Sequence, residues 1–204
     1  MDLYFSPLAC SMASRIVVYE TGEAARFHRV DTKAGRTADG ADYRTINPKG
    51  LVPALRTEDG EVLTENAAIL QFLADRAPQA GLAPTGFQRY RLQQWLSFVG
   101  SELHKSVFTP LLSPTADAAA KAAARKAAEP RFAYLDEHLA GREWLLDDFS
   151  VADAYMAAVL NWAQFVGLDL APWPNVAAYR ERLHARPSVA RALGEEMELY
   201  RQAA

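Results

Sequence analysis

The stretch INPKGLVPALRTEDGEVLTENAAILQFLADR, residues 46–76, decides the fold of the first part of the chain. Residues 47–50 predict a turn, because Asn, Pro and Gly all favour turn geometry. Residues 52–55 are expected to form a strand that begins at a proline, and Asp59-Gly60 predicts a hairpin to an antiparallel neighbour. Residues 65–76 carry apolar side chains at helical spacing, so a helix follows the hairpin.

Upstream of this stretch, the sequence alternates between short strands and helices. Residues 3–5 predict a strand, and residues 11–21 predict a helix that Gly22 ends. Residues 27–30 predict a second strand, and the polar residues 33–40 lead into a short helical or loop segment. The resulting order, β-α-β-α-β-β-α, predicts an α/β fold for the first domain.

The pattern becomes helical throughout after residue 86, which indicates a second domain. We expect residues 1–78 to form the first domain, residues 79–86 a linker, and residues 87–204 an all-α helical bundle domain. On a helical wheel, one side of the first helix of the bundle is apolar, and Ser97, Ser101 and His104 form a polar stripe on the other side.

The composition is that of an ordinary globular protein, with 50% hydrophobic and 23% charged residues among 204. A formal net charge of −3 offers no basic face for nucleic acid. No segment reaches the ~18 apolar residues of a membrane span, and the N-terminus lacks the apolar core of a signal peptide. We therefore expect a cytoplasmic protein that binds neither nucleic acid nor membranes.

Cys10 is the single cysteine, which excludes an intramolecular disulfide and a cysteine-based metal cluster, and we expect no metal. It lies between the first strand and the first helix, where free N–H groups and the helix dipole lower the pKa of a thiol. This position predicts a reactive thiol that is partly ionised near neutral pH. The alternative is a small buried apolar residue, as most free cysteines are.

Two further segments have the features of ligand contacts. A cis Val52-Pro53 bond would present the main chain of Val52 to an extended peptide, although the trans bond is far commoner. Glu65 and Asn66 stand at the start of a helix, where N–H groups bind a carboxylate and a glutamate binds an ammonium group. The pair suits the head group of an α-amino acid; the alternative is N-capping by Asn66 with Glu65 solvated.

Ser150 and Asp153 precede an apolar run with the spacing of a capping box. In such a box the serine oxygen accepts from a helix amide and the acid accepts from the serine N–H. Asp153 is therefore expected to support folding and not catalysis.

Five segments occur in a specific order and spacing: LYFSPLACSMASRI, INPKGLVPAL, LTENAAILQFLAD, QWLSFVGSELHKSVFTPL and DDFSVADAY. In these segments the chain resembles the bacterial beta class of glutathione transferases over essentially its full length. The resemblance implies a thioredoxin-like fold for residues 1–78, a cis bond before Pro53, glutathione as co-substrate, and a homodimer.

Position by position, the resemblance implies glutathione contacts from Cys10, the main chain of Val52, Glu65, Asn66, Ser97, Ser101, Glu102, Leu103 and His104. Cys10 and His104 are the implied catalytic residues, with His104 donating to Cys10 or to the substrate sulfur. The alternative for His104 is a surface histidine that caps the end of its helix. Many members have, where this chain has Gly35, a lysine that binds the glycyl carboxylate. Either Lys33 or Arg36 replaces it here, or the affinity for glutathione is lower.

These features predict a glutathione transferase that conjugates glutathione to hydrophobic electrophiles, with Cys10-dependent thiol-disulfide exchange as a further activity. The alternatives are a non-catalytic binder of glutathione or apolar ligands, and a dedicated glutathione-dependent dehalogenase or lyase. The electrophile itself is not identified, because its pocket is expected to consist of apolar residues such as Leu8, Phe108, Leu112 and Trp162.

Overall fold

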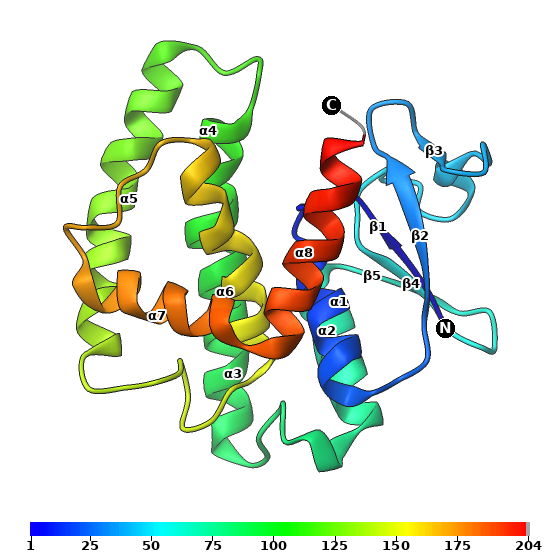
Figure 1. Ribbon diagram of the computed structural model, residues 1–204, viewed down its shortest axis with the longest axis horizontal. Helices are drawn as coiled ribbons and strands as arrows, with labels where there is room; N and C mark the ends of the chain where they lie inside the picture. The colour runs from blue at the N-terminus through cyan, green and yellow to red at the C-terminus, as the bar shows by residue number, and fades with distance from the viewer. Residues whose placement is uncertain (203–204) are drawn as a thin grey trace.

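A five-stranded mixed sheet forms the first part of the computed structural model, which describes residues 1–202 (Figure 1). The strand order is β3-β2-β1-β4-β5. The central strand pairs in parallel with its neighbour on one side and antiparallel with its neighbour on the other. The strands are β1 (Asp2–Phe5), β2 (Arg26–Asp31), β3 (Arg36–Thr37), β4 (Ala54–Arg56) and β5 (Val62–Thr64). The predicted antiparallel pair is β4 with β5.

Helix α1 (Met12–Thr21) links the two halves of the molecule. It packs on α2 (Asn66–Arg76) within the first half, and on α6 (Val151–Asn161) and α8 (Pro187–Arg201) of the second. Its residues from Met12 to Val18 are all buried, so the helix is enclosed on nearly every side. The start of α1, which follows Cys10, is therefore held between the sheet and the helical half.

The second helix of the expected order is absent from this part of the described chain. Residues 33–45 instead contain the short strand β3 and a single 3₁₀ turn, η1 (Tyr43–Thr45). The Asp42 side chain accepts from the Arg44 N–H and so caps that turn. Tyr43 is fully buried and donates its hydroxyl to the Leu51 carbonyl at 2.8 Å. This anchoring favours a turn over a helix that would carry Tyr43 away from the core.

The second half is helical, as predicted, so the α/β plus all-α fold class is confirmed. Residues 81–86 contain neither helix nor strand. The helical elements from residue 78 onward are η2 (Pro78–Ala80), α3 (Phe87–Ser97), the π-helical η3 (Phe98–Phe108), α4 (Thr109–Leu112), α5 (Ala118–Leu139), α6, η4 (Trp162–Phe165), α7 (Pro174–Ala185) and α8. Segments α3, η3 and α4 follow one another without a break.

The predicted capping box at the start of α6 is confirmed. Ser150 is the N-cap, and both of its reciprocal hydrogen bonds with Asp153 are present. Asp153 is fully buried and also accepts from the Tyr179 hydroxyl at 2.6 Å and from the Leu145 N–H at 2.9 Å. Its carboxylate therefore joins α6, α7 and the preceding loop.

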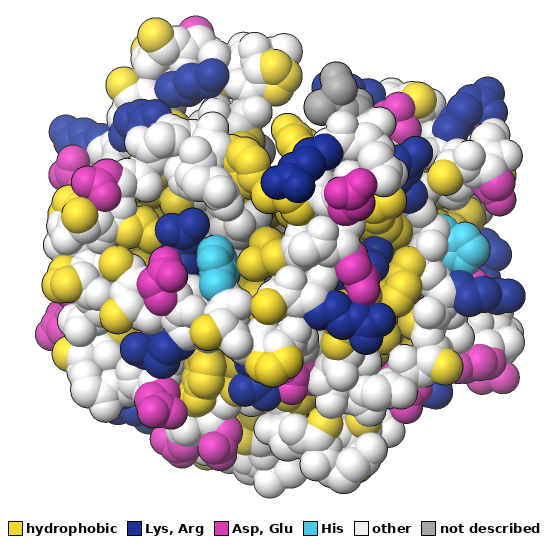
Figure 2. All heavy atoms as spheres, in the orientation of Figure 1, with side chains coloured by type: hydrophobic (Ala, Val, Ile, Leu, Met, Phe, Trp, Pro, Cys, Tyr) yellow, Lys and Arg dark blue, Asp and Glu magenta, His cyan; other side chains and the backbone are white. Residues whose placement is uncertain are grey.

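Acidic and basic side chains are intermixed on the face drawn in Figure 2, with no extended patch of one sign. Within residues 1–202, no helix has the length and apolar character needed to cross a membrane.

Candidate functional site

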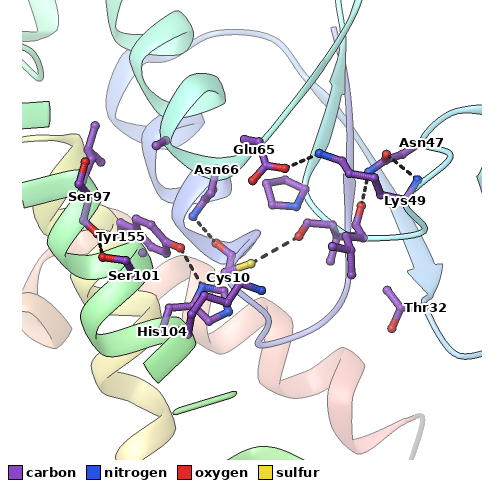
Figure 3. A pocket seen from close by; sticks show the side chains of 17 residues that line it. Cys10, Thr32, Asn47, Lys49, Glu65, Asn66, Ser97, Ser101, His104 and Tyr155 are labelled. Carbon is purple, nitrogen blue, oxygen red and sulfur yellow. Dashed lines mark hydrogen bonds and ion pairs between the residues drawn. The ribbon is translucent and has the colours of Figure 1, made fainter. Parts of the chain in front are cut away.

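Two cavities meet at Cys10 and His104, between the sheet half and the helical half. The first has a volume of about 580 Å³ and is bounded by Glu65 and Asn66 on one side and by Ser97, Ser101 and His104 on the other (Figure 3). Val52 also lines it. The second has a volume of about 640 Å³, and its wall is mainly apolar, with Leu8, Leu112, Trp162, Phe165 and Tyr200. Cys10 and His104 line both. Phe108 is fully buried and does not line the second cavity.

Cys10 is only partly exposed and has two polar contacts that hold it between the cavities. Its Sγ donates to the Val52 carbonyl at 3.4 Å, and its own carbonyl accepts from Asn66 Nδ2 at 3.1 Å. Burial raises the pKa of the Cys10 thiol to about 11. The prediction of a thiol partly ionised at neutral pH is therefore wrong, because desolvation of the thiolate outweighs the nearby N–H groups and Lys105.

The Val52-Pro53 bond is cis, as expected. The main chain just before it is fixed by side chains from the preceding turn. Asn47 Nδ2 donates to the Leu51 carbonyl at 2.7 Å, and the Tyr43 hydroxyl donates to the same oxygen. Val52 therefore stands at a defined position on the cavity wall.

Glu65 lies at the start of α2 with φ of 72°, in the left-handed region that residues other than glycine rarely adopt. Its side chain is 72% exposed and forms an ion pair with Lys49 at the cavity. Lys49 also donates to Thr64 Oγ1 at 3.1 Å. The Glu65 carboxylate is thus placed to hold an ammonium group, and in this structure it holds that of Lys49.

Asn66 is the first residue of α2 and does not cap it. Its buried side chain accepts from Ser14 Oγ at 3.1 Å and donates to the Cys10 carbonyl. The N-capping alternative is therefore wrong. The side chain of Asn66 holds the Cys10 loop against α1 and α2.

The polar stripe lines the first cavity, but two neighbouring residues do not. Ser97, Ser101 and His104 all lie on its wall. Leu103 is fully buried in the core, and Glu102 forms an ion pair with Arg131 at 2.7 Å. Glu102 and Leu103 were expected to contact glutathione, and neither lines this cavity, so their contacts with glutathione stay a prediction. The cause is the helical geometry, since successive residues of a helix point to different sides.

His104 is largely buried and uncharged. Its Nδ1 lies 2.8 Å from the Tyr155 hydroxyl, and its ring packs edge-on against Trp162 at 4.8 Å between centroids. Burial, together with the neighbouring Lys105, lowers the pKa of His104 to about 4. Burial also raises the pKa of Tyr155, so its hydroxyl keeps its proton. The surface-capping alternative for His104 is therefore wrong.

Tyr155 is a site residue that sequence reasoning missed. It lies in α6, whose residues are all buried, so no polar pattern distinguishes it. Lys49 and Lys105 line the first cavity as its cations, whereas neither Lys33 nor Arg36 does. Arg36 instead donates to the Gly40 carbonyl at 2.8 Å.

Each half of the chain matches a known protein family. Residues 9–76 match the family described as "Glutathione S-transferase, N-terminal domain", and residues 98–187 match "Glutathione S-transferase, C-terminal domain". The glutathione S-transferase GstA of Escherichia coli O157:H7 is 41% identical over 199 residues, which cover 96% of this chain and 98% of that protein. This chain belongs to the glutathione S-transferase family.

Solved structures agree with this assignment. The sphingomonad glutathione S-transferase complexed with glutathione is 45% identical, with a TM-score of 0.92 over 96% of this chain and 98% of that one. The bacterial beta-class enzyme of Sphingomonas chungbukensis gives the same identity, TM-score and coverage. The predicted resemblance to the beta class and the predicted glutathione transferase are therefore confirmed. Within residues 1–202, no group of three or more His, Cys, Asp or Glu residues is placed to hold a metal ion.

Proposed function

We propose that the first cavity binds glutathione with its sulfur beside Cys10 and His104, and that the second binds a hydrophobic electrophile. The observation that carries this proposal is that, among residues 1–202, the two cavities share only Cys10 and His104. A thiol and an apolar electrophile bound on either side would meet where Cys10 and His104 lie. Holding both reactants in this way removes much of the entropic cost of their encounter.

The residues on the wall match the parts of the tripeptide. The Glu65 carboxylate binds the ammonium of the γ-glutamyl end in place of Lys49, and the N-terminus of α2 binds its carboxylate. The main chain of Val52 pairs with the cysteinyl portion. Ser97 and Ser101 complete the opposite wall.

Cys10 and His104 act in this proposal as hydrogen-bond donors to the sulfur of glutathione. Cys10 keeps its proton at neutral pH because its pKa is about 11. The neutral His104 ring carries its proton on Nε2 when the Tyr155 hydroxyl donates to Nδ1. Two neutral donors stabilise a thiolate without adding a buried charge. The glutathione thiol releases its proton to water, its sulfur then forms the S–C bond, and the leaving group departs with the electron pair.

Thiol-disulfide exchange is a second candidate activity, favoured by the position of Cys10 at the junction of both cavities. After losing its proton, the Cys10 sulfur attacks one sulfur of oxidised glutathione, and one glutathione thiolate leaves and takes up a proton. We expect intact-mass spectrometry to show one reversible glutathionyl group, which Cys10→Ala abolishes. The rate of glutathione conjugation to an aryl halide is expected to fall less in Cys10→Ala than the rate of disulfide exchange.

Glu65→Gln tests the main proposal. Removing the charge that holds the ammonium is expected to weaken glutathione binding about tenfold or more in titration calorimetry. Glu61→Gln is the matched control, since Glu61 is exposed in the β4–β5 hairpin that precedes Glu65 and does not line the cavity. Unchanged affinity in Glu65→Gln, or equal losses in both variants, would exclude the proposed orientation.

The remaining proposals concern assembly, location and domain limits. Phe87 and Tyr90 of α3 are 72% and 67% exposed, and their rings lie 6.1 Å apart, which supports burial of this face in a homodimer. Sedimentation equilibrium showing a monomer at micromolar concentration would contradict this.

A free thiol at Cys10 suits the reducing cytoplasm. The division at residues 78 and 87 remains a proposal that limited proteolysis can test.

A further inference from the structure

Leu8, two residues before Cys10, has an unusual conformation and is held from both sides. Its φ is 60°, and it shares this left-handed region with only one other non-glycine residue of the described chain, Glu65. Its N–H donates to Glu196 Oε2 at 2.7 Å, and its carbonyl accepts from Trp162 Nε1 at 2.8 Å. Both partners belong to the helical half, 188 and 154 residues away in sequence.

Glu196 is a fully buried carboxylate on α8, the helix that runs beside α1 between the two halves (Figure 1). Arg15 of α1 balances its charge, with Nε 3.0 Å from Glu196 Oε1. The Arg15 guanidinium is itself packed over the rings of Phe5 and Phe27, at 4.2 and 4.1 Å from their centroids. Because the Glu196 side chain is fully buried against Arg15, it has little freedom to move away from Leu8.

The loop between Leu8 and Cys10 is so short that a movement of Leu8 would also move Cys10. The Ala9 N–H donates to the Ser6 carbonyl at 3.1 Å, and Ser11 Oγ donates to the same carbonyl at 3.3 Å. Leu8 itself forms part of the wall of the apolar cavity. A change at Leu8 therefore reaches both Cys10 and that wall.

We propose that Glu196 is a positioning residue, which accepts the Leu8 N–H and thereby fixes the Cys10 loop and one wall of the apolar cavity. The acceptor oxygen of Glu196 is the essential feature, because it satisfies the Leu8 N–H. Without this acceptor, Leu8 would leave its left-handed conformation. The expected effect on electrophile binding rests on the proposed function, whereas the expected effect on the reactivity of Cys10 does not.

Glu196→Met and Glu196→Gln separate this role from the charge of the carboxylate. Methionine removes the acceptor, whereas the glutamine amide retains an oxygen that can accept the Leu8 N–H. Iodoacetamide, followed by intact-mass spectrometry at fixed pH, reports on Cys10 without glutathione or electrophile. We expect Glu196→Met to raise the alkylation rate about tenfold, and Glu196→Gln to stay close to wild type.

Glu195→Gln is the matched control. Glu195 is the preceding residue of α8 and also pairs with Arg15, at 2.9 Å, but its carboxylate contacts Tyr19 and Arg191 and not Leu8. We expect no change in Cys10 alkylation in this variant. In conjugation assays, Glu196→Met is expected to raise the KM for an aryl halide more than the KM for glutathione.

Three results would overturn the proposal. Alkylation in Glu196→Met equal to wild type would show that Leu8 holds its place without Glu196. Equal effects in Glu195→Gln would point to packing of α8, and equal effects in Glu196→Gln would point to the charge. Should Glu196→Met not fold, Arg15→Met/Glu196→Met removes both buried charges and the acceptor together, and wild-type alkylation in that variant would also refute the role.

Discussion

The Cys10 thiol donates to the Val52 carbonyl across a distance of 3.4 Å from Sγ to O, joining the start of α1 to the cis-proline turn (Figure 3). The same main chain is proposed to pair with the cysteinyl portion of glutathione. Cys10 therefore contacts the same main-chain segment that is proposed to bind glutathione. In the proposed complex, glutathione shares or replaces this contact when its sulfur approaches Cys10.

Cys10 is expected to react slowly at neutral pH. Because burial raises its thiol pKa to about 11, the alkylation rate of the folded protein should continue to rise with pH beyond 9 and show no plateau near 7. A pH titration of iodoacetamide alkylation, restricted to the range in which the protein remains folded, provides the measurement. A plateau with an apparent pKa of ~7 or below would show that the thiolate is stabilised as in reactive cysteines.

His104 is expected to remain neutral from pH 5.5 to 8, because burial lowers its pKa to about 4. The carbon-bound ring protons of His104 should therefore not shift in NMR spectra across this range, and His104→Asn assigns the signal. The pKa of His104 in the folded state lies below the ordinary value of 6.5. The contribution of His104 to the free energy of unfolding is therefore complete above pH 6.5 and is lost as the pH falls towards 4. An inflection near 6.5 would contradict this environment.

Gly35→Lys is expected to lower stability without tightening glutathione binding. Gly35 has φ of 69°, and a side-chain Cβ there would lie 3.1 Å from Arg44 Nη1. The left-handed backbone alone costs a lysine about 1–2 kcal/mol. Gly40→Lys is the control, since Gly40 has φ of 90° and open space around it. Tighter binding of glutathione by Gly35→Lys in calorimetry would show instead that Arg44 moves aside.

Asp153→Ala is expected to lower the free energy of unfolding by about 3 kcal/mol or more, because it leaves buried donors of Leu145, Ser150 and Tyr179 without an acceptor. Asp117→Ala removes the exposed N-cap of α5 and should cost only about 1 kcal/mol. Urea unfolding compares the two. Lost glutathione binding with an unchanged unfolding midpoint in Asp153→Ala would assign the residue to the site instead.

The stability difference between wild type and Glu196→Gln is expected to depend on pH. Burial raises the pKa of Glu196 to about 7 from an ordinary 4.5, although Arg15 opposes this and Glu195 adds to it. The contribution of Glu196 is therefore complete below 4.5 and declines as the pH rises to 7, by up to about 3 kcal/mol. Urea unfolding of both proteins between pH 5 and 8 measures the difference. A constant difference would show that Arg15 keeps the carboxylate ionised throughout.

Local sequence determined the elements whose signals lie within a few residues of one another. The hairpin at Asp59-Gly60 and the capping box of Ser150 with Asp153 formed as predicted, because turn and cap geometry depends on neighbouring residues. The five segments in order were also sufficient to indicate the family. The exception was the stretch around Tyr43, where burial of one ring favoured a turn over a helix.

Only the tertiary structure decided the chemical state of the site. The pKa of Cys10 and that of His104 depend on how much solvent the packed helices remove, which position along the chain does not specify. The contact of Tyr155 with His104 joins residues 51 apart in sequence, and that of Glu196 with Leu8 joins residues 188 apart. Local patterns place a residue on a strand, turn or helix. These contacts arise because α6 packs against α1 and against η3, which carries His104, and because α8 packs against α1.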